Sequence, residues 1–134
     1  MTSKSMPQVL IEALARARNI DGPIRVQLDD FAGALRQHHP EFAEAVDRLV
    51  ERLQHVGAGG AAPNVGERLP DFLLPDQAGH LVALGELLSE GPAAITFFRG
   101  HWCPYCQLHS RALARVHDRV EANGATLVGI TPEL

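Results

Sequence analysis

The stretch Phe97-Phe98-Arg99-Gly100-His101-Trp102-Cys103-Pro104-Tyr105-Cys106 contains both cysteines of the chain, separated by two residues. It follows a short apolar run, residues 93–98, and it opens an amphipathic stretch, residues 104–123. The run predicts a buried strand and the amphipathic stretch predicts a helix. Backbone N–H groups at the start of a helix are unpaired and partially positive, which favours a thiolate over a thiol. The pattern therefore predicts a thiol redox site where a strand ends and a helix begins.

Beyond the cysteines, the helix is expected to continue as one element to Asn123-Gly124, a pair typical of a left-handed helix end. Residues 125–130 predict a second apolar strand. Two apolar strands joined by one helix form a parallel, right-handed crossover, and ligand chemistry in such sheets collects at the carboxyl ends of the strands. The expected buried stripe of the helix consists of Tyr105, Leu108, Ala112, Val116 and Val120.

Upstream, residues 71–74 and 80–84 flank a turn and predict a hairpin, and residues 86–90 predict one helical turn. The glycine- and alanine-rich segment 57–63 marks a boundary, so we expect a helical N-terminal segment with its linker at 1–62 and an α/β domain at 63–134. The first segment predicts helices at 7–18, 24–38 and 40–56. The three helices are too short to be stable alone, which favours a structural cover or a dimerisation arm for the whole segment. The third helix carries an apolar face that comprises Phe42, Val46, Leu49, Leu53 and Val56.

Composition limits the class of protein. The chain has 134 residues, 46% of them apolar, and a formal net charge of −4. This charge gives no reason to expect nucleic acid or an anionic membrane as a partner. Residues 1–7 lack the apolar core of a secretory signal, so a Cys-x-x-Cys motif favours cytoplasmic redox chemistry over a structural disulfide framework.

Other interpretations of the cysteine stretch remain open. His101, Cys103, Cys106 and His109 have the spacing of a metal site, but four ligands within nine residues would need a strained arrangement, so we expect no metal and no cofactor. The pair is alternatively two inert thiols. In the redox interpretation Cys103, at the cap, is expected to be the more exposed thiol, with Cys106 one turn further along. Arg99 either steadies a thiolate and binds an oxidant oxygen, or is merely solvated.

These residues, together with an upstream segment, resemble a known family. The matching parts are Val65-Gly66-Glu67-Arg68-Leu69-Pro70-Asp71-Phe72-Leu73-Leu74-Pro75-Asp76, Gly79 and the stretch from Phe97 to Cys106. They resemble the peroxiredoxin-like branch of the alkyl hydroperoxide reductase/thiol-specific antioxidant family, which has a thioredoxin-like fold. The resemblance implies reduction of peroxides or disulfides by Cys103 and Cys106 as a redox disulfide pair, with a thioredoxin- or glutaredoxin-like dithiol donor and assembly as a homo-oligomer.

Two departures from the family pattern shape the expectation. Cys103 stands where peroxiredoxins carry Thr or Ser, three residues before the peroxidatic position, which Cys106 occupies. A peroxidase would attack with Cys106 and resolve with Cys103, whereas a disulfide reductase would attack with Cys103. The fold also normally continues past the strand at 125–130, so we expect a C-terminally incomplete thioredoxin-like α/β domain, with a non-catalytic association module as the alternative to an enzyme.

Overall fold

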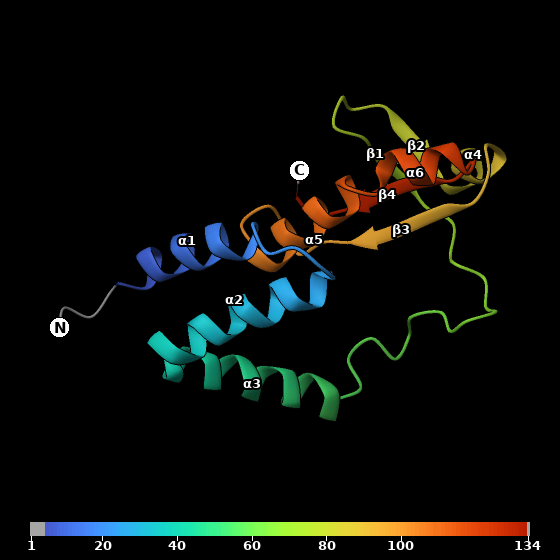
Figure 1. Cartoon of the computed structure of the whole chain (residues 1–134). Helices are drawn as coiled ribbons and strands as arrows, with labels where there is room; N and C mark the ends of the chain where they lie inside the picture. Colours follow the sequence, from blue (N-terminus) through green and yellow to red (C-terminus); the bar gives the residue numbers. More distant parts are fainter. Residues whose placement is uncertain (1–4, 134) are drawn as a thin grey trace. The chain divides into compact units, whose positions relative to one another are not determined.

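The computed structural model describes residues 5–133, which contain both helices and strands (Figure 1). They divide into two compact units. The first consists of residues 5–62 together with Trp102–Ser110, and the second of Pro63–His101 together with residues 111–133. The grouping of residues 102–110 with the N-terminal helices has no counterpart in the sequence pattern.

Three helices form most of the first unit: α1 (Met6–Ala17), α2 (Ile24–His38) and α3 (Pro40–His55). The Gln8 side chain accepts a hydrogen bond from the Ser5 backbone N–H at the start of α1, and Pro40 starts α3 at a position where no N–H is needed. Within this unit α2 lies between α1 and α3 (Figure 1). The buried core of the unit comprises Val9, Ala13, Ala17, Phe31, Ala34, Leu35 and Leu108.

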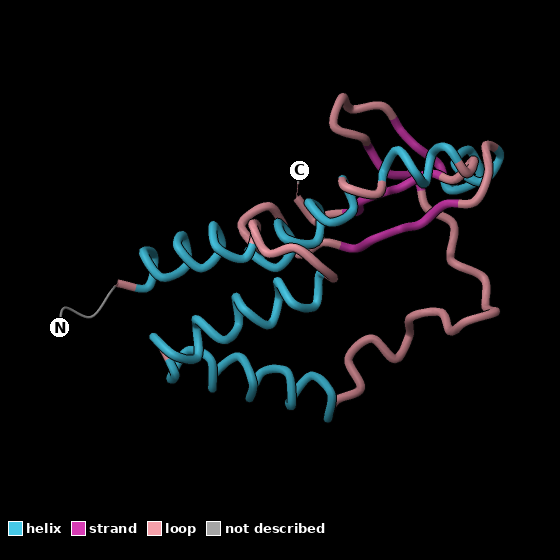
Figure 2. The backbone as a smooth tube through the Cα atoms, in the orientation of Figure 1, coloured by secondary structure: helices cyan, strands magenta, loops and turns pink. Residues whose placement is uncertain are grey.

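A long connection links α3 to the second unit (Figure 2). Gly57 ends α3 with a φ of 66°, and the N–H of Ala58 bonds back to the carbonyl of Leu53. This pattern is a Schellman cap, which satisfies carbonyls at the end of the helix. The glycine of the boundary segment therefore has a defined role in ending α3.

The predicted hairpin is present as β1 (Leu73–Pro75) and β2 (Leu81–Ala83), which pair antiparallel. Its turn is organised by Asp76, whose carboxylate accepts hydrogen bonds from the backbone N–H groups of Ala78 and His80, each at 2.8 Å. These bonds, with that from His80 foremost, lower the pKa of Asp76. A short helix, α4 (Leu84–Ser89), follows β2 directly.

The two predicted apolar strands are β3 (Ala93–Phe97) and β4 (Thr126–Ile130), and they pair in parallel as expected. Thr96 lies opposite Gly129 in the register. A Cβ at position 129 would lie 2.8 Å from the Phe98 ring, so only glycine fits here without displacing that ring. Because the two strands are parallel, with Phe97 opposite Ile130, their carboxyl ends lie side by side.

The prediction of one continuous helix over 104–123 is wrong. The structure has α5 (Pro104–Ala114) and α6 (His117–Ala122), separated by a turn. The break occurs because the N–H of Val116 bonds to Leu113, three residues back, which tightens the backbone. Of the expected stripe only Leu108 is fully buried. The end of α6 is as predicted, since Gly124 has a φ of 72°.

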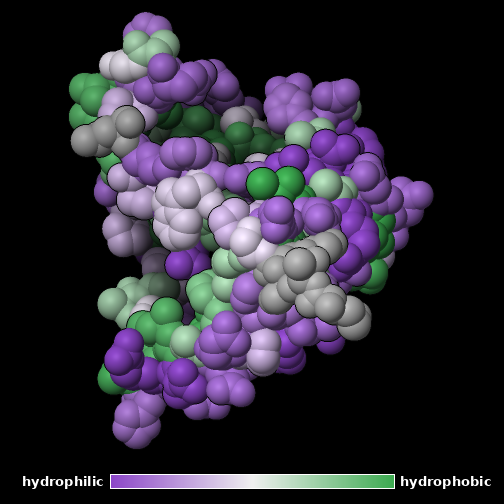
Figure 3. Space-filling model, turned by 90° about the vertical axis from the view of Figure 1, so that its left-hand side faces the viewer, coloured by the Kyte–Doolittle hydropathy of each residue, from purple (hydrophilic) through white to green (hydrophobic). Residues whose placement is uncertain are grey.

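Surface composition fits a folded chain in water, although apolar side chains remain exposed. Figure 3 shows one face of the molecule, on which hydrophilic side chains predominate and apolar ones appear in separate patches. Within residues 5–133, none of the helices has both the length and the apolar character needed to cross a lipid bilayer.

Candidate functional site

Both cysteines lie at the start of α5. The carbonyl of Cys103 accepts the first helical hydrogen bond, from the N–H of Gln107 at 3.0 Å, so Cys103 is the N-cap residue. Pro104 is the first helical residue, a position that suits its fixed φ and missing N–H. Cys106 is then the third residue of the helix. Both cysteines therefore lie in the first turn of the helix, whose backbone N–H groups lack partners within the helix.

The expected order of exposure of the two thiols is wrong. Cys103 is 1% exposed, whereas Cys106 is only partly buried. The first turns of α5 belong to the helical unit, and Leu108, one turn beyond Cys103, is part of the core built from α1 and α2. Cys103 is therefore the less accessible of the two residues, and Cys106 is the more accessible. Neither of the two cysteines is in a disulfide.

Two long-range contacts hold the first turn of α5 in place. The Tyr105 ring meets the Phe31 ring edge to face, with centroids 5.1 Å apart and planes at 86°. Burial, with a smaller contribution from Cys103, raises the pKa of the Tyr105 phenol. The Arg18 guanidinium donates a hydrogen bond to the Gln107 side chain. These contacts join residues far apart in sequence, so no local pattern predicts them.

Glu133, which sequence analysis did not identify, fixes the loop that leads to Cys103. Its Oε2 accepts hydrogen bonds from the His101 backbone N–H at 2.7 Å and from the Thr131 hydroxyl at 3.1 Å. Its Oε1 contacts His101 Nδ1. The hydrogen bond from the His101 backbone is the largest cause of a lowered pKa of Glu133. The strand order could have identified Glu133. This residue follows β4, and the carboxyl ends of parallel strands lie at the same edge of a sheet, so Glu133 can be expected near the residues that follow β3.

Glutamine at position 133 tests this contact. The pKa of Glu133 is lowered below 4.5 in the folded state, so the carboxylate stabilises the fold above the unfolded value and loses that contribution as pH falls through the folded value. We expect Glu133→Gln to lower the melting temperature near neutral pH, and the deficit to shrink below about pH 4.5. Thermal melts of both proteins across acidic and neutral pH measure this.

The matched control is Glu90→Gln, which removes an exposed carboxylate outside the contact. It reports the general effect of one fewer charge. If the melting temperatures of the wild type and Glu133→Gln differ by the same amount at every pH, the Glu133 carboxylate does not hold the loop.

The other candidate residues are placed as follows. Arg99 is exposed in the turn after β3, and His109 is partly buried on α5. Among residues 5–133, one group of three potential metal ligands has its ligand atoms within 4.8 Å of one another, and it consists of His117, Asp118 and Glu121. All three are exposed, and they do not belong to the predicted set of His101, Cys103, Cys106 and His109.

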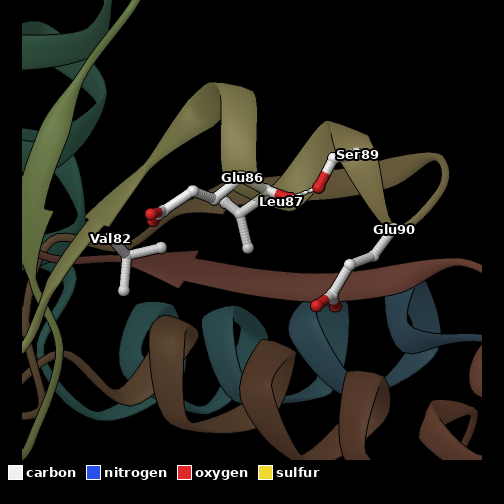
Figure 4. A pocket seen from close by; sticks show the side chains of 5 residues that line it. All are labelled: Val82, Glu86, Leu87, Ser89 and Glu90. Atoms are coloured by element: carbon white, nitrogen blue, oxygen red, sulfur yellow. Dashed lines mark hydrogen bonds between the residues drawn. The ribbon is translucent and has the colours of Figure 1, made fainter.

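A pocket of about 410 Å³ lies beside α4 in the second unit (Figure 4). Two of its polar side chains form hydrogen bonds within or at the ends of α4. The Glu86 carboxylate accepts a hydrogen bond from the Ala83 N–H, and the Ser89 hydroxyl donates one to the Glu86 carbonyl. Its other lining residues are Val82, Leu87 and Glu90. The residues that line this pocket therefore include no thiol that would supply redox chemistry.

Comparison with known proteins agrees with the cysteine geometry. The model of the AhpC/TSA family matches residues 65–133, a span that includes Cys103, Cys106 and Glu133. Members of this family are usually thiol peroxidases or thiol oxidoreductases. No curated protein and no solved structure matches the chain. Since the family match covers more than half of the 134 residues, the chain belongs to the AhpC/TSA family.

Proposed function

We propose that the protein is a thiol peroxidase that uses Cys106 as the attacking thiol and Cys103 as the resolving thiol. One observation carries this assignment: the two thiols share the first turn of α5, and Cys106 is only partly buried whereas Cys103 is buried. A peroxide reaches an exposed thiolate directly, whereas a thiol that is 1% exposed is protected from it. The AhpC/TSA family membership supports the same chemistry.

The reaction has two steps within the protein. The Cys106 thiolate attacks one peroxide oxygen, the O–O bond breaks, and the product alcohol or water leaves as Cys106 becomes a sulfenic acid. The Cys103 thiol then attacks the Cys106 sulfur, a disulfide forms, and water leaves with the sulfenic oxygen. Residues three apart at a helix start have Cβ atoms about 5–6 Å apart, so a small local adjustment brings the sulfurs into bonding range.

Two further components complete the proposal. A dithiol donor reduces the Cys103–Cys106 disulfide by exchange and restores both thiols, and a reducing compartment such as the cytoplasm supplies that donor. Arg99 lies four residues before Cys103 in the sequence, and we assign it to the peroxide oxygens because a guanidinium donates strong hydrogen bonds to oxygen. No metal or cofactor enters either step.

The test is peroxide consumption by the reduced wild-type protein. We expect one equivalent of hydrogen peroxide to be consumed without a donor, with a Cys103–Cys106 disulfide as the product found by mass spectrometry. Added dithiothreitol should then sustain turnover. Reduction of insulin disulfides without peroxide consumption would instead identify a disulfide reductase. No reaction with either substrate, from a folded protein with two titratable thiols, would leave an association module and overturn the proposal.

A further inference from the structure

One face of α3 leaves apolar side chains exposed. The helix packs on α2 through the buried Ala43 and the ion pair of Asp47 with Arg36, at 2.8 Å. A separate stripe lies beside that contact, with residues spaced alternately four and three apart. Its exposed fractions run from 37% to 68%, and it comprises Phe42, Val46, Leu49, Leu53 and Val56. This spacing is the seam of a two-helix coiled coil, which packs against another helix.

We propose that the α3 stripe binds the α3 stripe of a second copy of this chain, in an antiparallel pair related by a two-fold axis. If Val46 of one copy lies against Leu49 of the other, Phe42 of the first copy lies against Leu53 of the second. Every stripe residue from Phe42 to Leu53 then contacts an apolar residue of the other copy. The same surface patch serves both copies, as a two-fold interface requires.

Charge selects this arrangement over a parallel one. The side of the stripe away from α2 carries Glu41 near the start of the helix and Arg48 and Arg52 in its second half, with Glu41 and Arg52 both exposed. In the antiparallel register Glu41 of one copy lies within a turn of Arg52 of the other, and the symmetry repeats the pair. In a parallel pair, the side that carries Arg48 and Arg52 would instead face the α2 side of the other copy, so Glu41 and Arg52 would not meet.

The size of the α3 stripe limits how stable the dimer can be. A helix of 16 residues is about 24 Å long. One pair of such helices buries less than the roughly 800 Å² per partner that is typical of stable complexes. We therefore expect a reversible dimer whose population rises with protein concentration.

Sedimentation analysis of the full chain over a wide concentration range tests the proposal. The wild type should pass from monomer to dimer as concentration rises. Leu49→Lys places a charge at the centre of the seam and should raise the dissociation constant by at least about tenfold. The matched control is Ile11→Lys, which places the same charge at a 69% exposed apolar site on α1 and should leave the dissociation constant unchanged. Circular dichroism verifies that both variants fold.

A charge exchange tests the orientation. Glu41→Arg alone should weaken the dimer about three- to tenfold, because the new guanidinium would then face Arg52 of the second copy at both symmetric positions. The added change Arg52→Glu should restore the wild-type dissociation constant. A monomer at every concentration, or a dimer that Leu49→Lys does not weaken, would overturn the proposal. A dimer that the second change fails to restore would overturn the antiparallel arrangement. None of these outcomes depends on peroxide chemistry.

Discussion

Serine at position 106 is expected to abolish peroxide consumption, with a loss of at least about 1,000-fold that brings the rate to background. A hydroxyl in place of the sulfur is not ionised at neutral pH and does not attack the O–O bond. The change is small in volume and falls at a partly exposed position, so the fold should persist. Peroxide consumption with dithiothreitol measures the activity, and circular dichroism verifies the fold.

Serine at position 103 supplies the contrasting result. Cys103→Ser should still consume one equivalent of peroxide but should stop there, with Cys106 held as a sulfenic acid that dimedone traps. Alkylation of the reduced wild type should label Cys106 well before Cys103, because Cys103 is 1% exposed. If Cys103→Ser loses the first equivalent and Cys106→Ser retains it, the roles of the two thiols are reversed.

Alanine at position 31 should be the most destabilising single change in the helical unit. Phe31 is 1% exposed, lies in the core that contains Leu108, and meets Tyr105 edge to face. Truncation leaves a cavity and removes the ring contact, for a loss of about 3–5 kcal/mol in the free energy of unfolding. Urea denaturation followed by circular dichroism measures the loss.

The matched control is Phe42→Ala, which removes the same ring from a site 44% exposed on α3. At a protein concentration low enough to keep the chain monomeric, it should cost no more than about 1 kcal/mol. Equal losses for the two variants would contradict the assignment of Phe31 to the core.

Features that depend on nearby residues could be predicted from the sequence. The three N-terminal helices, the hairpin and the parallel β3–β4 pair follow from spacing and turn residues, and the structure contains them. Gly124 ends α6 as its position indicates. The cysteine motif also gave the position of both thiols at the start of a helix. For the helices, the hairpin and the helix ends, the physical cause lies within a few residues of its effect, whereas the β3–β4 pairing follows from the connection rule for two apolar strands joined by a helix.

Features that depend on distant residues could not be predicted. The burial of Cys103 at a helix start is not determined by its neighbours in sequence, and Glu133 reaches His101 across 32 positions of the chain. The break at Val116 was missed for a different reason. Apolar periodicity continues through a tightened turn, so the pattern resembles one helix while the hydrogen bonds form two.

The burial of Cys103 has a consequence for survival under oxidative stress. In the proposed reaction, the buried Cys103 is spared oxidation to sulfinic and sulfonic acids, so irreversible oxidation falls on Cys106. In that reaction, Cys103 remains a reduced thiol until Cys106 has been oxidised.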